Sequence, residues 1–139
     1  MSAALLFAVL AVVAGSTPSA ALPQVSRCHP VGAGLQKVLT SALAFPSGGT
    51  ISRVRRVTPL KRKNLYFVSG FIASPDLGDK KVLATWVTNR LDATAVVASL
   101  NVGAKSYSDW QRAQKAFPKV TMATEGARVS QRCANAAKA

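Results

Sequence analysis

Four segments rich in β-forming residues follow one another between residues 50 and 101. They are Thr50–Val57, Leu65–Ala73, Val82–Thr88 and Ala95–Asn101. The connections between them are roughly five to eight residues long, whereas a parallel crossover needs a dozen residues or more. The pattern therefore predicts a four-stranded antiparallel meander. The second segment is hydrophobic on both faces, which favours a central position in the sheet.

The first of these strands does not alternate regularly. Strict alternation would place Arg53 and Arg55 on the same face as Ile51 and Val57. A β-bulge near Arg55-Arg56 would instead let Val54 and Val57 share a face and turn the arginines outward. We therefore expect a bulge at that point.

Helical periodicity precedes the strands. One apolar stripe is formed by Val31, Leu35, Val38, Leu39, Ala42 and Leu43. Pro30 suits the first helical position, because a donor there would be unpaired in any case. We expect Trp86 and Trp110 to anchor the core against this helix.

Helical patterns also follow the strands. Tyr107, Trp110, Gln114 and Phe117 predict a short helix capped by Ser106 or Ser108, and Thr124 is the expected cap of a last helix that carries Cys133. The predicted fold class is α+β, with the N-terminal helix packed on the four-stranded meander and one or two short C-terminal helices.

The first 21 residues are typical of a secretory signal peptide. Ala3–Gly15 is an unbroken apolar run, and cleavage after Ala21 would place small residues at both positions that determine the cut. This predicts a signal peptide at 1–21 and a single small domain at 22–139, secreted or held at the exterior of the cell envelope. A retained N-terminal anchor is the alternative, although the run is shorter than the roughly twenty residues that cross a bilayer.

Two cysteines, Cys28 and Cys133, lie near the ends of the predicted mature chain. In an exported protein they have one intramolecular pairing, and the alternative is two free buried thiols. The predicted disulfide would close the domain and bring its two ends side by side.

The chain is poorly supplied with groups for catalysis. His29 is its one histidine, and the five acids are Asp76, Asp79, Asp92, Asp109 and Glu125. No sequence cluster has the spacing of a metal site. We therefore expect no catalytic site, no metal and no cofactor. A small secreted nuclease that uses His29, Glu125 and several arginines is a less favoured alternative.

The net charge of +13 is the strongest functional signal. A basic hairpin between residues 53 and 63 holds six candidate anion-binding residues: Arg53, Arg55, Arg56, Lys61, Arg62 and Lys63. Tyr66 could offer a nearby stacking ring. Such a surface suits an anionic envelope polymer, a lipid or nucleic acid.

Two other interpretations stay open. In the first, the charges have no ligand and serve to protect an exposed hairpin from aggregation. In the second, the domain is a secreted inhibitor or partner module of an extracellular enzyme. In either case we expect a monomer.

One stretch resembles a group of small exported proteins of high-GC Gram-positive bacteria. The resemblance rests on Ala84–Asn89, on Ala104–Trp110 and on the late Cys133. It implies export and an α+β fold. It implies no activity.

Overall fold

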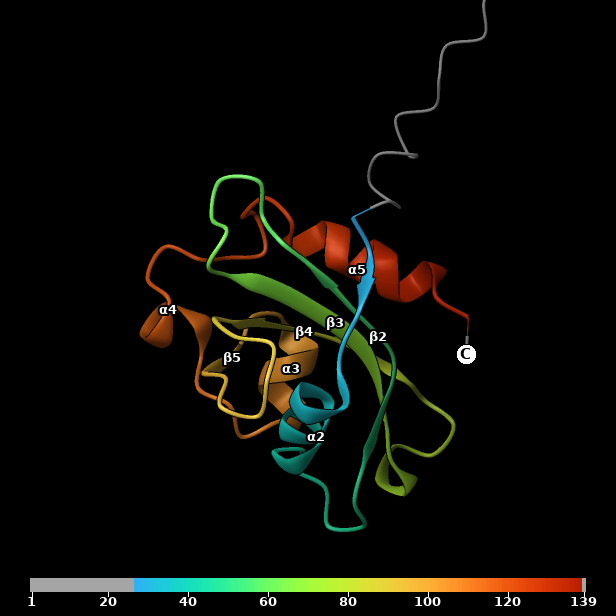
Figure 1. The fold of residues 1–139 in the computed structure, drawn as a ribbon. Helices are drawn as coiled ribbons and strands as arrows, with labels where there is room; N and C mark the ends of the chain where they lie inside the picture. The colour runs from blue at the N-terminus through green and yellow to red at the C-terminus, as the bar shows by residue number, and fades with distance from the viewer. Residues whose placement is uncertain (1–26, 139) are drawn as a thin grey trace, which may run out of the picture.

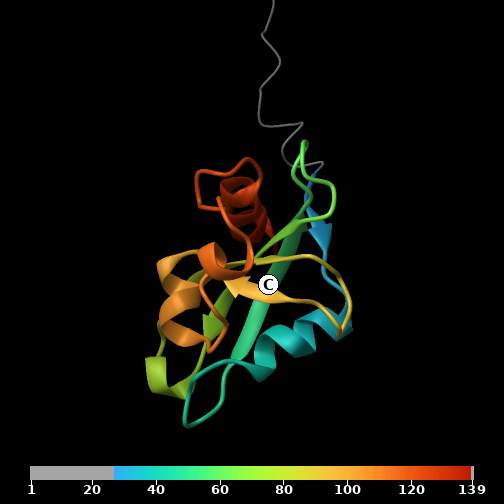
Figure 2. The same cartoon turned by 90° about the vertical axis from the view of Figure 1, so that its left-hand side faces the viewer.

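The computed structural model describes residues 27–138, so the predicted signal peptide at 1–21 lies outside the described residues. The described chain forms a five-stranded antiparallel sheet with helices on both faces (Figure 1). Helix α2 (Ala33–Ser41) covers one face, and α5 (Ala127–Ala136) covers the other, as the side view in Figure 2 shows. The predicted α+β class is confirmed, with one strand more than expected.

The strands lie side by side in chain order. They are β1 (His29–Pro30), β2 (Thr50–Val57), β3 (Tyr66–Ala73), β4 (Val82–Thr88) and β5 (Val97–Ser99). The last four form the predicted antiparallel meander, with β3 at the centre. Strand β1 was not predicted. Pro30 pairs with Arg55 at the sheet edge, where a missing N–H is tolerated, and therefore does not open the helix.

The bulge in β2 lies two residues earlier than predicted. The register with β3 shifts between Ser52 and Arg55, and Arg53 adopts a φ of 53°. Gly70 opposite leaves room for the bulge, because a Cβ there would lie 2.7 Å from Cγ2 of Ile51. The prediction that Val54 and Val57 share a face was wrong, because Val54 packs in the α2-side core while Val57 packs against α5.

The core on the α2 face is built around Trp86, which is fully buried with Leu35 and Leu39. Its Nε1 donates to Oγ of Ser108 over 3.3 Å. Trp110 packs against the same cluster. The placement of both tryptophans beside the N-terminal helix is therefore confirmed.

The helix predicted at Tyr107–Phe117 is wrong in position. Helix α3 (Val102–Tyr107) begins earlier, and α4 (Ala113–Ala116) follows after an extended segment. Asn101 caps α3: its Oδ1 accepts from the backbone N–H groups of Ala104 and Thr85, and its Nδ2 donates to the Leu83 carbonyl. Asn101 thus also satisfies the free edge of β4 beyond the short β5.

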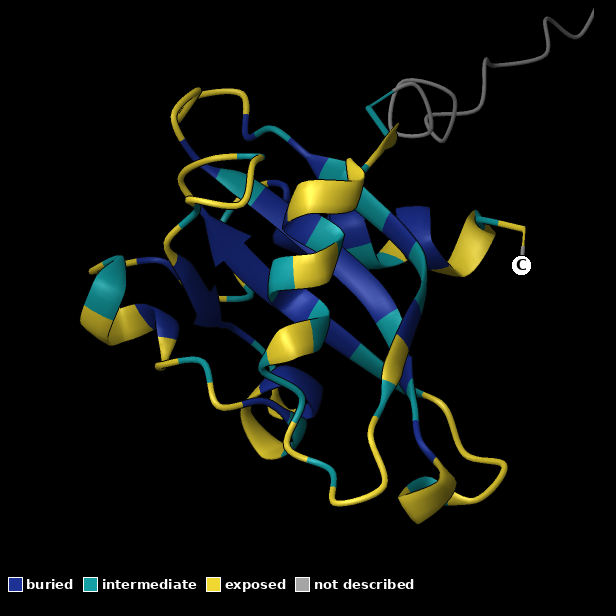
Figure 3. Ribbon diagram, turned by 60° about the horizontal axis from the view of Figure 1, so that its bottom comes forward, coloured by how far each residue is buried: buried dark blue, intermediate teal, exposed yellow. Residues whose placement is uncertain are grey.

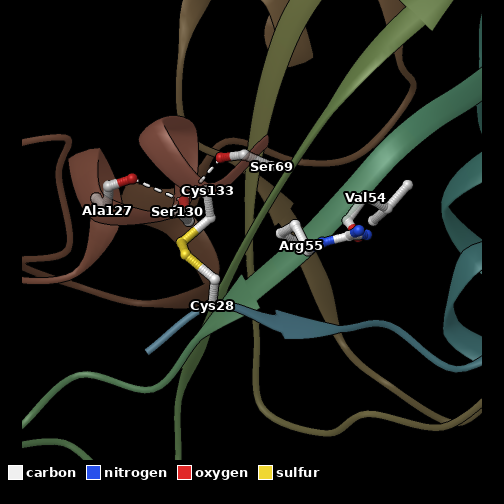
Figure 4. Close-up of a disulfide and its surroundings, with 7 residues drawn as sticks. All are labelled: Cys28, Val54, Arg55, Ser69, Ala127, Ser130 and Cys133. Carbon is white, nitrogen blue, oxygen red and sulfur yellow. Dashed lines mark hydrogen bonds between the residues drawn. A yellow bond between two sulfur atoms is a disulfide. The ribbon is translucent and has the colours of Figure 1, made fainter. Parts of the chain in front are cut away.

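Helix α5 begins after Gly126, which adopts a φ of 97°, and not after a Thr124 cap. Thr124 instead accepts a hydrogen bond from the Thr121 N–H in the preceding turn. The predicted Cys28–Cys133 disulfide is present, with the two Cα atoms 5.4 Å apart (Figure 4). It joins the start of the described chain to α5 and brings the two ends of the fold together.

A buried hydroxyl pair lies beside the disulfide. Ser69 of β3 and Ser130 of α5 are hydrogen-bonded over 2.7 Å (Figure 4).

Between residues 27 and 138 no helix has the length and apolar character needed to cross a bilayer.

Candidate functional site

The six predicted anion-binding residues do not form one row. Lys61, Arg62 and Lys63 lie together in the exposed connection between β2 and β3 (Figure 3). Arg53 lies over the ring of Phe71, 5.6 Å from its centroid, and Arg56 lies over Tyr66 at 5.8 Å. The Tyr66 ring, which was predicted to offer a stacking surface to a ligand, is therefore in contact with the guanidinium of Arg56.

The three arginines of β2 lie on different faces of the sheet. Arg55 pairs in register with Ser69, whose side chain meets α5, and Phe71 shares that side of β3 by alternation. Arg53 and Arg55 therefore belong to the α5 side. Arg56 pairs with Val68 of the α2-side core and belongs to the opposite side. Nη1 of Arg55 donates to the backbone carbonyl of Val54 over 2.8 Å (Figure 4).

The loop with Lys61–Lys63 is fixed at its base by one ion pair. Nη1 of Arg27 donates to Oε1 of Glu125 over 2.5 Å, and Nη2 of Arg27 donates to the Thr58 carbonyl over 3.0 Å. Oε2 of Glu125 accepts from the backbone N–H of Leu60 over 2.8 Å. Three segments far apart in the sequence are thereby joined at one end of the sheet.

Two open depressions adjoin Arg27 at this end. One has a volume of about 370 Å³ and is lined by Arg27, His29, Thr58, Pro59, Leu60 and Lys63. The other has a volume of about 300 Å³, and its charged lining residues are Arg27, Glu125, Arg128 and Arg132. His29 and Glu125 thus lie at the same end of the molecule, in neighbouring depressions.

We call this end the basic pole and define it by six cations: Arg27, Lys61, Arg62, Lys63, Arg128 and Arg132. Sequence reasoning found the three loop residues and missed the other three. Arg128 and Arg132 are four positions apart on α5 and therefore share a helix face. Their spacing, together with the predicted disulfide, could have placed them beside Arg27.

The charge of the pole is weakly compensated. Residues 27–138 contain all 18 Lys and Arg residues, and only Arg27 and Arg90 form an ion pair with an Asp or Glu there, which leaves 18 − 2 = 16 without one. Glu125 is the acid that lines the pole. Its pKa is lowered, first by the hydrogen bond from Arg27 and then by the Leu60 N–H.

The opposite end of the sheet has a different character. There Asp76, in the 3-10 helix η1 (Pro75–Leu77), accepts from the backbone N–H and the hydroxyl of Ser47. These bonds lower the pKa of Asp76, the backbone bond most. The depression at this end is lined by Ser, Gly, Thr, Ala and Pro residues, without a cation.

The geometry of Glu125 is unfavourable for general-base catalysis. Both of its carboxylate oxygens accept hydrogen bonds, and a lowered pKa makes a carboxylate a weaker base. In the part of the chain that the structure describes, no three His, Cys, Asp or Glu residues gather as a metal site would require.

Comparison of the chain with protein families, with curated proteins and with solved structures found no significant match.

Proposed function

We propose that the protein is an exported, non-enzymatic domain that binds anionic polymers or surfaces through the basic pole. The observation that carries the proposal is the convergence of six cations from three segments around a single acid. Glu125 is already occupied by Arg27 and Leu60. The charge of Lys61–Lys63, Arg128 and Arg132 is therefore free to act on an external anion.

The proposed location follows from two features that fit together. The Cys28–Cys133 disulfide is compatible with an oxidising, extracellular environment. The apolar run Ala3–Gly15 has the pattern of a signal peptide. We therefore place the mature protein outside the cell or at the exterior of its envelope.

Charge reversal tests the proposal. The variant Lys61→Glu/Lys63→Glu removes charge from the pole, and Lys80→Glu/Lys81→Glu is its control, because these exposed lysines lead into β4 at the opposite end of the sheet. Both variants change the net charge equally. Long-range attraction from net charge alone would therefore weaken binding to the same extent in both.

Binding to a soluble polyanion such as polyphosphate is measured over a range of salt concentrations. If two phosphate contacts are lost, the slope of log K against log[salt] becomes shallower by about 1.4 to 1.8 in the pole variant and stays near wild type in the control. Equal effects of the two variants would refute a localised site. A separate Arg53→Glu/Arg55→Glu variant reports whether the α5 side of β2 takes part.

Capture from culture medium separates this proposal from a partner module of an extracellular enzyme. A polyanion elutes as salt rises, because its contacts are with charges. Recovery of one enzyme that stays bound at high salt would favour the partner module instead.

A further inference from the structure

We infer that the tip of the basic pole docks on an anionic lipid bilayer, with Leu60 entering the interface and the surrounding cations contacting headgroups. This inference rests on the proposed function and names the anionic partner. It is carried by an exposed leucine beside the cations of the pole and by the fixed base of its loop.

The exposure of Leu60 is the first observation. Three large hydrophobic residues between 27 and 138 are exposed, and Leu60 is one of them at 68%. It precedes Lys61, Arg62 and Lys63 directly in the sequence and lines a depression with Arg27 and Lys63. Cations near a membrane surface are attracted to anionic headgroups, and an exposed apolar side chain beside them gains by leaving water for the interface.

The same pattern is poorly explained by a soluble polyanion. A phosphate chain offers the Leu60 side chain no apolar surface, so the leucine would add nothing to binding. In a bilayer interface the side chain leaves water, and each Lys or Arg near the surface adds attraction to anionic headgroups. The combination therefore favours a lipid surface over a free polymer.

The second observation is that the tip is held in place. The backbone N–H of Leu60 donates to Glu125, and Arg27 connects that carboxylate to the Thr58 carbonyl. The loop thus presents Leu60 from a fixed base. Less conformational entropy is lost on docking when the contacting segment is already held.

The test uses the protein that an exporting bacterial host releases. Its N-terminus is determined by mass spectrometry and must be the same in all variants. Co-sedimentation is measured with vesicles of phosphatidylglycerol and phosphatidylcholine, with vesicles of phosphatidylcholine alone, and in parallel with soluble polyphosphate. Leu60→Ser is compared with Val102→Ser. Val102, the first residue of α3, is 77% exposed and lies outside the pole, so it controls for the loss of any exposed apolar side chain.

We expect Leu60→Ser to bind the anionic vesicles about tenfold more weakly than wild type. Its binding to polyphosphate and the vesicle binding of Val102→Ser should be unchanged. Vesicle binding by Leu60→Ser equal to that of wild type would overturn the inference and leave the proposed function standing. If the wild-type protein binds neither the anionic vesicles nor polyphosphate, both the inference and the proposed function are overturned.

A gain-of-signal variant keeps the test independent of lost binding. Leu60→Trp places an indole at the tip, and its emission should shift to the blue when anionic vesicles are added, because indole rings settle at the membrane interface. Val102→Trp should show no such shift. An unchanged emission maximum in Leu60→Trp, with the protein sedimenting with the vesicles, would show that the pole meets headgroups through charge alone and would overturn the insertion of Leu60.

Discussion

Removal of the Cys28–Cys133 disulfide should cost the domain a large part of its stability. The appropriate variant is Cys28→Ser/Cys133→Ala. Cys28 is half-buried and tolerates a hydroxyl, whereas Cys133 is 3% exposed, and a serine there would bury a polar group. Alanine at position 133 leaves the packing of Val129 in α5 against Val57 of β2 otherwise intact.

The magnitude follows from the length of chain that the bond closes. The two cysteines are 105 positions apart, and the chain-entropy model assigns about 4.7 kcal/mol to a loop of this length. Measured values for native disulfides in small domains are about 2–5 kcal/mol. Since small domains are stable by about 5–15 kcal/mol, a contribution of about 4.7 kcal/mol would be about a third of the total at the upper limit and nearly all of it at the lower limit.

Urea denaturation followed by circular dichroism measures the effect. The midpoint should fall, and the m-value should rise, because the unfolded chain without the crosslink exposes more surface. Wild type in reductant should reproduce the variant, which separates the bond from the side-chain substitutions. A difference below about 1 kcal/mol, with an unchanged m-value, would refute the view that this bond closes the fold.

Two further predictions concern hydrogen bonds that hold loops in place. Glu125→Ala should destabilise the protein by about 1–2 kcal/mol at neutral pH, because it removes the acceptor for Arg27 and Leu60. The pKa of Glu125 is lowered in the folded state, so this stabilisation is complete above its ordinary value of 4.5 and is lost as the pH falls through the folded pKa. The unfolding free energies of variant and wild type should therefore converge in acid, and a difference that persists there would contradict the assignment. Asn101→Ala should cost about 2–4 kcal/mol, because the α3 cap and two bonds to the β4 edge are lost together; the exposed Asn135→Ala should stay within about 0.5 kcal/mol of wild type in the same urea titration.

The central meander could be predicted because its signals are local. Strands β2 and β4 have the predicted bounds, since runs of β-formers there are bounded by Gly, Pro, Asn and Asp. Strand β1 could not be found in this way. Its two residues carry no strand pattern, and they pair with β2 beside the disulfide that attaches Cys28 to α5.

The helix predicted at Tyr107–Phe117 was misplaced because tertiary contacts override the periodic pattern. The spacing of Tyr107 and Trp110 is helical, yet Ser108 forms a bridge with Leu43, and the Asp109 N–H donates to the Ala42 carbonyl at the end of α2. These contacts end α3 at Tyr107. Asn101 was predicted to end the strand Ala95–Asn101, and its role as the N-cap of α3 was therefore missed.

The candidate site was half predictable for a related reason. Lys61–Lys63 stand out because they are consecutive. Arg128 and Arg132 reach the same pole only through the packing of α5. Arg55 and Arg56 of β2 lie on different faces, because consecutive residues of a strand alternate. A linear cluster of charge therefore located one part of the surface and could not define its extent.

The most direct test of the basic pole is a titration of ¹⁵N-labelled protein with polyphosphate, followed by amide chemical shifts. If the pole binds, the shifts should concentrate at residues 27, 60–63, 128 and 132, and they should reverse as salt is added. The amide chemical shifts of residues 47–49, 74 and 76–81 at the opposite end should not change. Shifts spread evenly over the exposed lysines and arginines, or centred on Lys80 and Lys81, would contradict a localised anion site.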